Sequence, residues 1–196
     1  MSNRSDFVKV VKKLGPELYC HSLFVEECVG ALYDYFELNN TLGNNKISKN
    51  NWLIAGFIHD VDNFGEYKST HPLKTKEVLS KYGLKINKQI NDIILAHGPE
   101  ITHLFPESLA QWSLLCADNL VGLITALVSN NYNGIIDLKT DVILADIFRK
   151  PENPNSTRRK KILMCSKIDG LNIPLNKFID ICFIAMKKCV KIHCLQ

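Results

Sequence analysis

The sequence lacks the features typical of membrane, secreted and disordered proteins. Within its 196 residues no apolar run approaches the roughly 20 residues needed to cross a bilayer, and residues 1–13 mix basic side chains with Asp6 instead of supplying a signal-peptide core. There is no CxxC pair, and the 7 cysteines lie mostly within apolar stretches, which favours reduced, buried thiols over a disulfide framework. We therefore expect a cytoplasmic protein with no membrane partner.

A sustained alternation of apolar and polar residues, the mark of a half-buried strand, is also absent. Almost every patterned segment repeats at the helical period, so the sequence predicts an all-α domain, a compact bundle of about seven to nine helices. We expect one domain over residues 1–196, with a core at 16–130 and a C-terminal helical extension at 139–196. The predicted helices cover residues 16–38, 52–58, 71–82, 87–97, 106–129 and 141–149, with a last one from 174 and loops at 39–51 and 61–69.

The excess of basic over acidic residues is small, but it is concentrated in one place. The formal net charge is +4, too little to indicate nucleic-acid binding by itself. Residues 149–161, here called the basic segment, hold six basic residues and one acidic residue, which leaves the rest of the chain close to neutral. Two interpretations stay open: Arg158 and Arg159 bind substrate phosphates, or the segment is a solvated helix start. Aromatic residues are not interleaved with these charges, so a single-strand-binding platform is not indicated.

Several histidines and aspartates occur where the pattern calls for apolar residues. His21 lies on the apolar face of its predicted helix, His59 and Asp60 follow a very apolar run, His97 continues an isoleucine stripe, and Asp118 interrupts the most hydrophobic predicted helix. An unpaired buried carboxylate costs several kcal/mol, and neither apolar run contains a Lys or Arg. A divalent metal would compensate these groups together, and imidazole with carboxylate suits Fe, Mn, Zn, Ni or Co.

Each of these residues taken singly has an ordinary interpretation. A histidine on an apolar face is more often a hydrogen-bonded core residue than a ligand, and Asp118 alone is compatible with a link between helices. His71, which precedes Pro72, is compatible with a solvated helix start. The prediction of a metal site therefore depends on the whole set of four histidines and two aspartates.

Five sequence words in this order carry a family resemblance. They are HSLFV at His21, IAGFIHDVD at His59, HPLKTKEVL at His71, ILAHG at His97 and CADNLVGLITAL at Asp118. The set resembles the HD-domain superfamily of metal-dependent phosphohydrolases in its six-ligand, two-metal form, most of all its small hydrolases. The resemblance covers residues 21–128 strongly and the basic segment and last helix weakly. It implies the HD-domain helical bundle as the fold.

The resemblance also implies the ligand set of a binuclear centre. His21, His59, Asp60 and Asp118 would hold one divalent ion, and Asp60, His71 and His97 a second, with Asp60 bridging. The two ions, with Mg also compatible, would hold a bridging hydroxide that attacks a small phosphate ester, most plausibly a nucleotide or related metabolite. If one ion binds instead of two, His71 and His97 would contact the substrate or hold another metal ligand in place.

The sequence departs from the family pattern just after the ligand pair. Many phosphodiesterases of the family read HDIGK, whereas residues 59–63 here read HDVDN, without the lysine. Lys68 and Lys74 are candidates to replace it: we expect Lys74 to be catalytic and Lys68 to bind substrate. Asp62 is expected to be an acid, a base or a partner of a ligand histidine, and Glu66 a solvated residue. No GYP signature follows His97, so cyclic-di-GMP is not the predicted substrate.

Two other functions fit the same ligand order. One is a di-iron oxygenase of the HD superfamily, similar to myo-inositol oxygenase. The other is a non-catalytic, metal-stabilised domain that binds a nucleotide and regulates a partner, an alternative that the missing lysine keeps open. A redox-inert metal that supports full activity would exclude the oxygenase.

Overall fold

The computed structural model describes residues 2–43, 47–131, 134–148 and 156–193, and every regular element in these ranges is a helix. This confirms the predicted all-α class. The helices in chain order are α1 (Arg4–Leu14), α2 (Pro16–Leu38), α3 (Lys49–Ile58), the 3-10 helix η1 (Gly65–Thr70), α4 (Thr75–Lys81), α5 (Lys88–Leu95), α6 (Pro99–Thr102), α7 (Leu109–Asn131), α8 (Thr140–Ile147), α9 (Ser156–Leu163), the 3-10 helix η2 (Met164–Ser166) and α10 (Leu175–His193).

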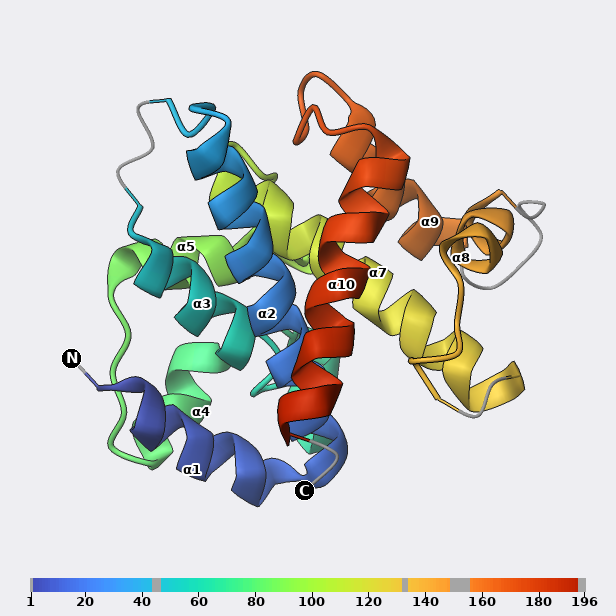
Figure 1. Cartoon of the computed structure of the whole chain (residues 1–196). Helices are drawn as coiled ribbons and strands as arrows, with labels where there is room; N and C mark the ends of the chain where they lie inside the picture. The colour runs from blue at the N-terminus through green and yellow to red at the C-terminus, as the bar shows by residue number, and fades with distance from the viewer. Residues whose placement is uncertain (1, 44–46, 132–133, 149–155, 194–196) are drawn as a thin grey trace.

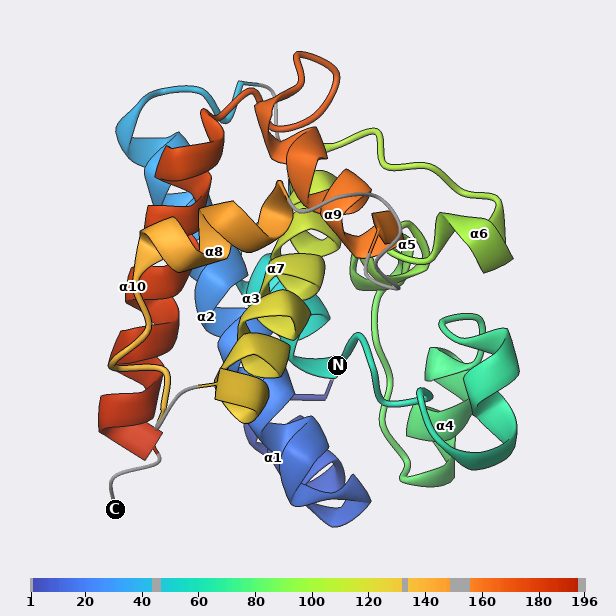
Figure 2. The same ribbon diagram turned by 90° about the vertical axis from the view of Figure 1, so that its right-hand side faces the viewer.

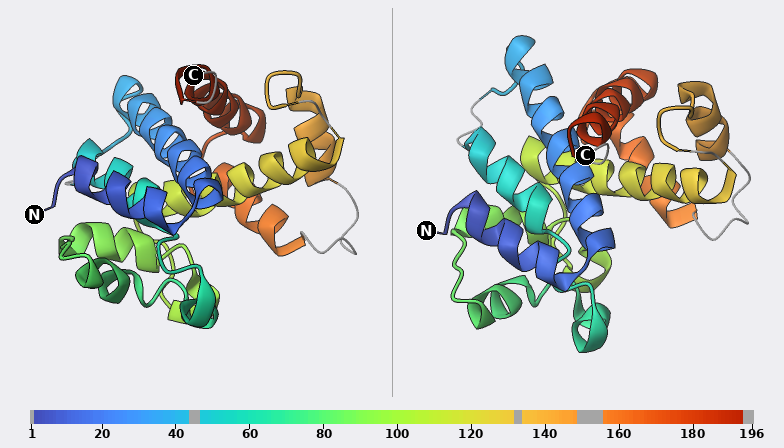
Figure 3. Two further views of the ribbon diagram at one scale, coloured as in Figure 1. Left: turned by 90° about the horizontal axis from the view of Figure 1, so that it is seen from below. Right: turned by 60° about the horizontal axis from the view of Figure 1, so that its bottom comes forward.

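Helix α2 is the centre of the arrangement. It packs against α3, α10, α7 and α1, and Figure 1 shows it between α3 on one side and α10 on the other. The second long helix, α7, carries α9 on its outer side, as Figure 2 shows. Seen from below in Figure 3, α7 (yellow) runs across the middle, with α10 (red) on one side and the green segment containing α4 and α5 on the other. The two long helices thus contact α1, α3, α5, α8, α9, α10 and η2 between them.

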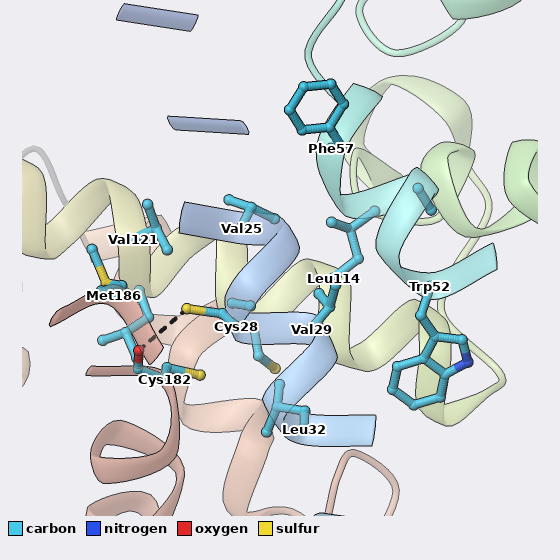
Figure 4. Close-up of a cluster of buried hydrophobic side chains, with 14 of the residues drawn as sticks. Val25, Cys28, Val29, Leu32, Trp52, Phe57, Leu114, Val121, Cys182 and Met186 are labelled. Atoms are coloured by element: carbon cyan, nitrogen blue, oxygen red, sulfur yellow. Dashed lines mark hydrogen bonds between the residues drawn. The ribbon is translucent and has the colours of Figure 1, made fainter. Parts of the chain in front are cut away.

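The hydrophobic core lies where α2 meets α3, α7 and α10 (Figure 4). Cys28 and Leu32 of α2 are completely buried, and α3 adds Trp52 and Phe57. From α10 comes Met186, also completely buried. The six cysteines in the described ranges are free thiols, and five of them are buried.

Two glycines let α2 and α3 approach each other closely. A Cβ atom at Gly56 would lie 3.2 Å from the Cα atom of Glu26 and 2.8 Å from a methyl carbon of Val29. A Cβ atom at Gly30 would lie 2.8 Å from the Leu53 side chain. Because the two backbones nearly touch, the C-terminal end of α3 lies against α2, and both helices carry predicted metal ligands.

One helix in the described part of the chain, Leu109–Ser129 within α7, is long and apolar enough to cross a membrane. The sequence predicts this helix, over residues 106–129. However, 61% of its most apolar stretch is buried inside the protein, and α7 packs against α2, α3, α5 and α9. Its apolar side chains therefore supply the core of the bundle.

The predicted boundaries near the site need correction. The helix expected at 71–82 begins only at Thr75, because the residue before a proline is pushed into extended backbone, and His71 has φ −58° and ψ 134°. The loop expected at 61–69 contains most of η1. The helix expected at 52–58 begins earlier, at Lys49, because the Ser48 side chain caps it by accepting the backbone N–H of Asn51.

Other helices also differ from the expectation. Helix α7 begins at Leu109 and not at Pro106, because Ser108 and Gln111 form a capping box: the Ser108 N–H donates to Gln111 Oε1 at 3.0 Å and the Gln111 N–H to Ser108 Oγ at 3.4 Å. Helices α1 and α6 were not predicted. Helix α1 carries its own capping box at Asn3, a local signal that the sequence does contain.

Candidate metal centre

Six polar side chains that are far apart in the sequence meet at one place in the fold. They are His21 on α2, His59 and Asp60 at the end of α3, His71 after η1, His97 after α5, and Asp118 on α7. Their ligand atoms form two groups, one of His21, His59, Asp60 and Asp118 and the other of Asp60, His71 and His97, and within each group the atoms lie within 4.8 Å of one another. The residues that the sequence singled out are therefore brought together in two groups able to hold a metal ion.

The carboxylate of Asp60 divides its two oxygen atoms between these groups. Its Oδ2 lies 3.6 Å from Nε2 of His21 and 3.6 Å from Nε2 of His59. Its Oδ1 lies 3.1 Å from Nε2 of His71 and 4.0 Å from Nε2 of His97. A carboxylate can bridge two ions in this way, whereas a neutral imidazole offers a single lone pair.

Two of the imidazoles are fixed with one nitrogen turned away from the centre. His59 Nδ1 donates to the Gly56 carbonyl at 2.8 Å, and His97 Nδ1 donates to the Ile94 carbonyl. A carbonyl oxygen only accepts, so the proton of each neutral ring is on Nδ1 and the Nε2 lone pair faces the centre. Bonds of this kind fix the tautomer and the ring orientation of metal-binding histidines.

Histidine nitrogens face each other across both groups at short range. His71 Nε2 lies 3.0 Å from His97 Nε2, and His21 Nε2 lies 3.2 Å from His59 Nε2. Two lone pairs at these distances repel, so each arrangement requires a proton or a cation between the rings. Ligand atoms bound to one ion at 2.1 Å would be separated by about 3.0 Å in octahedral and about 3.4 Å in tetrahedral coordination. The donor set and its spacing therefore fit a divalent metal in each group.

In the absence of metal the carboxylates hold two of the imidazoles in the charged state. Burial disfavours charge on His59, but Asp60 and Asp118 outweigh it and raise the pKa of His59 to about 9. Burial likewise opposes charge on His71, yet its bonds to Asp60 and Asp62 raise its pKa to about 9. At neutral pH these two protons occupy the cluster, and a metal ion has to displace them.

His97 responds in the opposite way. Burial and then the positive charges of His59 and His71 lower the pKa of His97 to about 4. Its imidazole is therefore neutral at neutral pH and offers a free lone pair on Nε2. For the acids Asp60 and Asp118, burial alone would raise the pKa, but the neighbouring imidazoles hold the pKa of both carboxyls below the usual range. The cluster thus combines ionised carboxylates with a neutral imidazole, as metal ligation requires.

Comparison with protein-family models, with curated proteins and with solved structures finds no match to this chain. The interpretation of the site therefore depends on its own geometry and chemistry.

Asp62 lies behind the centre, where it holds His71 in place. Its side chain is completely buried and accepts three hydrogen bonds: from His71 Nδ1 at 2.7 Å, from the Lys74 backbone N–H at 2.8 Å and from Thr75 Oγ1 at 3.2 Å. Of the roles that the sequence left open for Asp62, the geometry favours the partner of a ligand histidine. The expected catalytic role of Lys74 is not favoured, because its ammonium group pairs with Glu77 at 3.0 Å and does not line the pocket.

A pocket of about 650 Å³ opens onto the centre. Its walls come from the metal-ligand cluster, from α6, from α7 and from α9. Besides five of the six candidate ligands, the lining residues are Asn63, Lys68, Gly98, Glu100, Ile101, Asn119, Gly122, Thr125, Ala126, Ser129, Arg158 and Lys161. Lys68, predicted to bind substrate, therefore faces the same space as the candidate metal ligands.

The basic segment divides into parts with different surroundings. Arg158 lines the pocket, and its contact with a substrate stays a prediction. Arg159 does not line it: its side chain is only 4% exposed and pairs with Asp146 at 2.7 Å, so it joins α9 to α8 and is not available to a substrate. Arg149 and Lys150 lie outside the described residues.

The sequence reasoning overlooked the wall that α7 contributes. Gly122, Thr125, Ala126 and Ser129 continue from Asp118 along the pocket side of this helix. They are small or polar in a helix that is otherwise strongly apolar, and they recur three or four positions apart. These small and polar residues interrupt the apolar pattern of the helix, and this interruption is the signal in the sequence that indicates a pocket wall.

Proposed function

We propose that the protein is a metal-dependent phosphohydrolase that acts on a small phosphate ester, with nucleotides as the foremost substrate class. The observation that carries the proposal is the division of the Asp60 oxygens between two groups of ligand atoms. The pocket supports it, because about 650 Å³ suits a ligand of nucleotide size and cations line it beside the centre. The resemblance to the HD-domain superfamily points in the same direction. A cytoplasmic location is part of the proposal.

Two bound divalent ions supply Lewis acidity to a phosphoryl oxygen and lower the pKa of a coordinated water. In the proposed reaction water adds to phosphorus, the bond from phosphorus to the ester oxygen breaks, and the leaving oxygen takes a proton. Asp60 holds the two groups of ligands together, and Asp62 keeps the His71 ring aimed at the centre. Lys68 faces the pocket, and in this proposal it replaces the lysine of the family pattern by neutralising charge on the phosphate.

Elemental analysis of the purified protein, followed by turnover with a panel of esters, tests the proposal. The protein is stripped with a chelator, reloaded with Mn, Co, Ni, Fe or Zn, and incubated with nucleotides and generic phosphate esters. We expect about two ions per chain and release of phosphate or nucleoside. Bound metal without hydrolysis of any ester would contradict the proposal.

The same experiment separates the two other functions. Full activity with redox-inert Zn excludes a di-iron oxygenase, whereas oxygen consumption by the iron form with no ester hydrolysis would favour it. A protein that binds nucleotides without converting them would point to a regulatory domain.

A further inference from the structure

Three cations of helix α9 differ in how they are neutralised. Arg159 pairs with Asp146 at 2.7 Å, and Lys161 pairs with Glu100 of α6 at 2.9 Å. Arg158 lines the pocket without a carboxylate partner among the described residues. Its positive charge is thus left for something that enters the pocket.

The guanidinium group of Arg158 rests on the bare backbone of α7. Its Nη1 donates to the Gly122 carbonyl at 3.2 Å, and a Cβ atom at Gly122 would lie only 3.0 Å from its Cζ. A guanidinium has five N–H donors, so most of its donors remain for a ligand. The absence of a side chain at Gly122 therefore creates the seat in which Arg158 lies against the pocket wall.

The position of the Arg158 guanidinium on α7 is separated from the candidate metal centre by a fixed distance along this helix. Asp118 and Gly122 both line the pocket and are four residues apart on α7. With a rise of 1.5 Å per residue, Arg158 is bound about 6 Å further along this helix than Asp118, roughly one turn. A phosphate at the metal centre and an anion at Arg158 therefore fit in one small molecule.

From this geometry, and on the basis of the function proposed above, we propose that the substrate carries two phosphate groups. One is hydrolysed at the metal centre, and Arg158 binds the other. The guanidinium fork matches two oxygens of a phosphate, and Lys161, on the same wall, remains paired with Glu100. The second phosphate is either joined directly to the first, as in a diphosphate, or attached to another position of the substrate, as in a bisphosphate.

Calorimetric titration of the Mn-loaded protein with AMP, ADP and adenosine 3′,5′-bisphosphate tests this proposal without requiring turnover. We expect at least one of the doubly phosphorylated ligands to bind about ten- to hundredfold more tightly than AMP, and the tighter one identifies the arrangement of the phosphates. The Arg158→Gln protein should lose that advantage and bind AMP as the wild type does. Equal affinity of the wild type for all three ligands would overturn the proposal.

Two further variants separate a specific contact from a general effect of charge. Lys160→Gln removes the same charge from the exposed face of α9 and should keep the preference for two phosphates. Gly122→Ala keeps the charge of Arg158 but pushes the guanidinium from its seat, and should weaken the doubly phosphorylated ligand alone. A loss with Lys160→Gln as large as that with Arg158→Gln would contradict the assigned contact.

Failure of this inference is distinguishable from failure of the proposed function. A protein that hydrolyses AMP and both doubly phosphorylated ligands with equal KM values, unchanged in Arg158→Gln, is a phosphohydrolase without the second phosphate site. A protein that binds doubly phosphorylated ligands through Arg158 but hydrolyses none has the site without the activity. Unchanged thermal unfolding of the Arg158→Gln protein shows that its effect on binding is local.

Discussion

The replacement of Asp62 by Asn tests whether a buried carboxylate aims one ligand of the candidate centre. The Asp62 side chain accepts from His71 Nδ1 at 2.7 Å through Oδ1 and from the Lys74 backbone N–H at 2.8 Å through Oδ2. Asn has the same shape but only one accepting oxygen, so whichever way its amide faces, one of these donors meets an NH₂ group. The lost bond to a charged acceptor is worth about 1.5–3 kcal/mol.

The consequence should be confined to one of the two ions. His71 belongs to the group with Asp60 and His97, so an energy loss of this size predicts that the second ion binds roughly ten- to hundredfold more weakly. The ion held by the His21 group should bind as before. Titration with Mn²⁺, followed by calorimetry and by electron paramagnetic resonance of the coupled pair, measures both affinities.

A matched control uses a nearby carboxylate that is exposed. Glu66→Gln, in η1, removes the same charge at an exposed position and should leave both metal affinities unchanged. If the Asp62→Asn protein binds two ions with wild-type affinities, the negative charge of Asp62 is not needed to orient His71. Loss of the first ion with the second retained would show that the ligands are grouped differently.

Asp60→Asn should abolish binding of both ions and all hydrolysis, because both groups share this carboxylate; two ions per chain in the variant by elemental analysis would refute the bridging role. Folding raises the pKa values of His59 and His71 from 6.5 to about 9 in the metal-free protein. The stabilisation from their positive charges is therefore complete below pH 6.5, and the metal-free protein should lose stability as the pH rises from there through about 9. Metal affinity should rise over the same interval as protons cease to compete, and a flat profile in thermal unfolding and metal titration between pH 6 and 10 would contradict both points. Gly56→Ala should cost about 1–3 kcal/mol of unfolding free energy in urea, because its Cβ atom meets the backbone of α2. Gly30→Ala, whose Cβ atom meets only a flexible leucine side chain, should cost less, and equal costs would argue against a tight backbone contact.

Local patterns were sufficient for the parts of the fold that depend on neighbouring residues. Pro16 at the first turn of α2, the Ser48 cap of α3 and the turn at Gly83 all act within a few positions of the chain. The capping box at Asn3 is a local signal of the same kind for α1. Pro72 pushes His71 into extended backbone, so α4 begins at Thr75 and not at residue 71 as expected.

Five of the six candidate ligands could be found from the sequence because a buried polar group is costly wherever it lies, and His71 followed from the family resemblance. Their partners could not be found, since hydrogen bonds across the fold have no sequence period. The sequence predicts a solvated Glu66, but among the roles that it leaves open for Asp62 only the fold shows that this carboxylate accepts from His71. In the same way Arg158 and Arg159 are adjacent in sequence and face opposite surroundings.

The amino-acid sequence by itself determined that the chain is helical, which stretches are apolar, and which of these stretches carry imidazole or carboxylate groups. These properties follow from periodicity and from the cost of desolvation, and both act on each segment separately. The tertiary structure alone decided that Asp60 lies between two groups of ligands, that Asp62 holds a ring in place, and that Arg158 rests on the bare backbone at Gly122. Those distances arise from the packing of α2, α3, α7 and α9, and helical periodicity does not specify which buried faces meet.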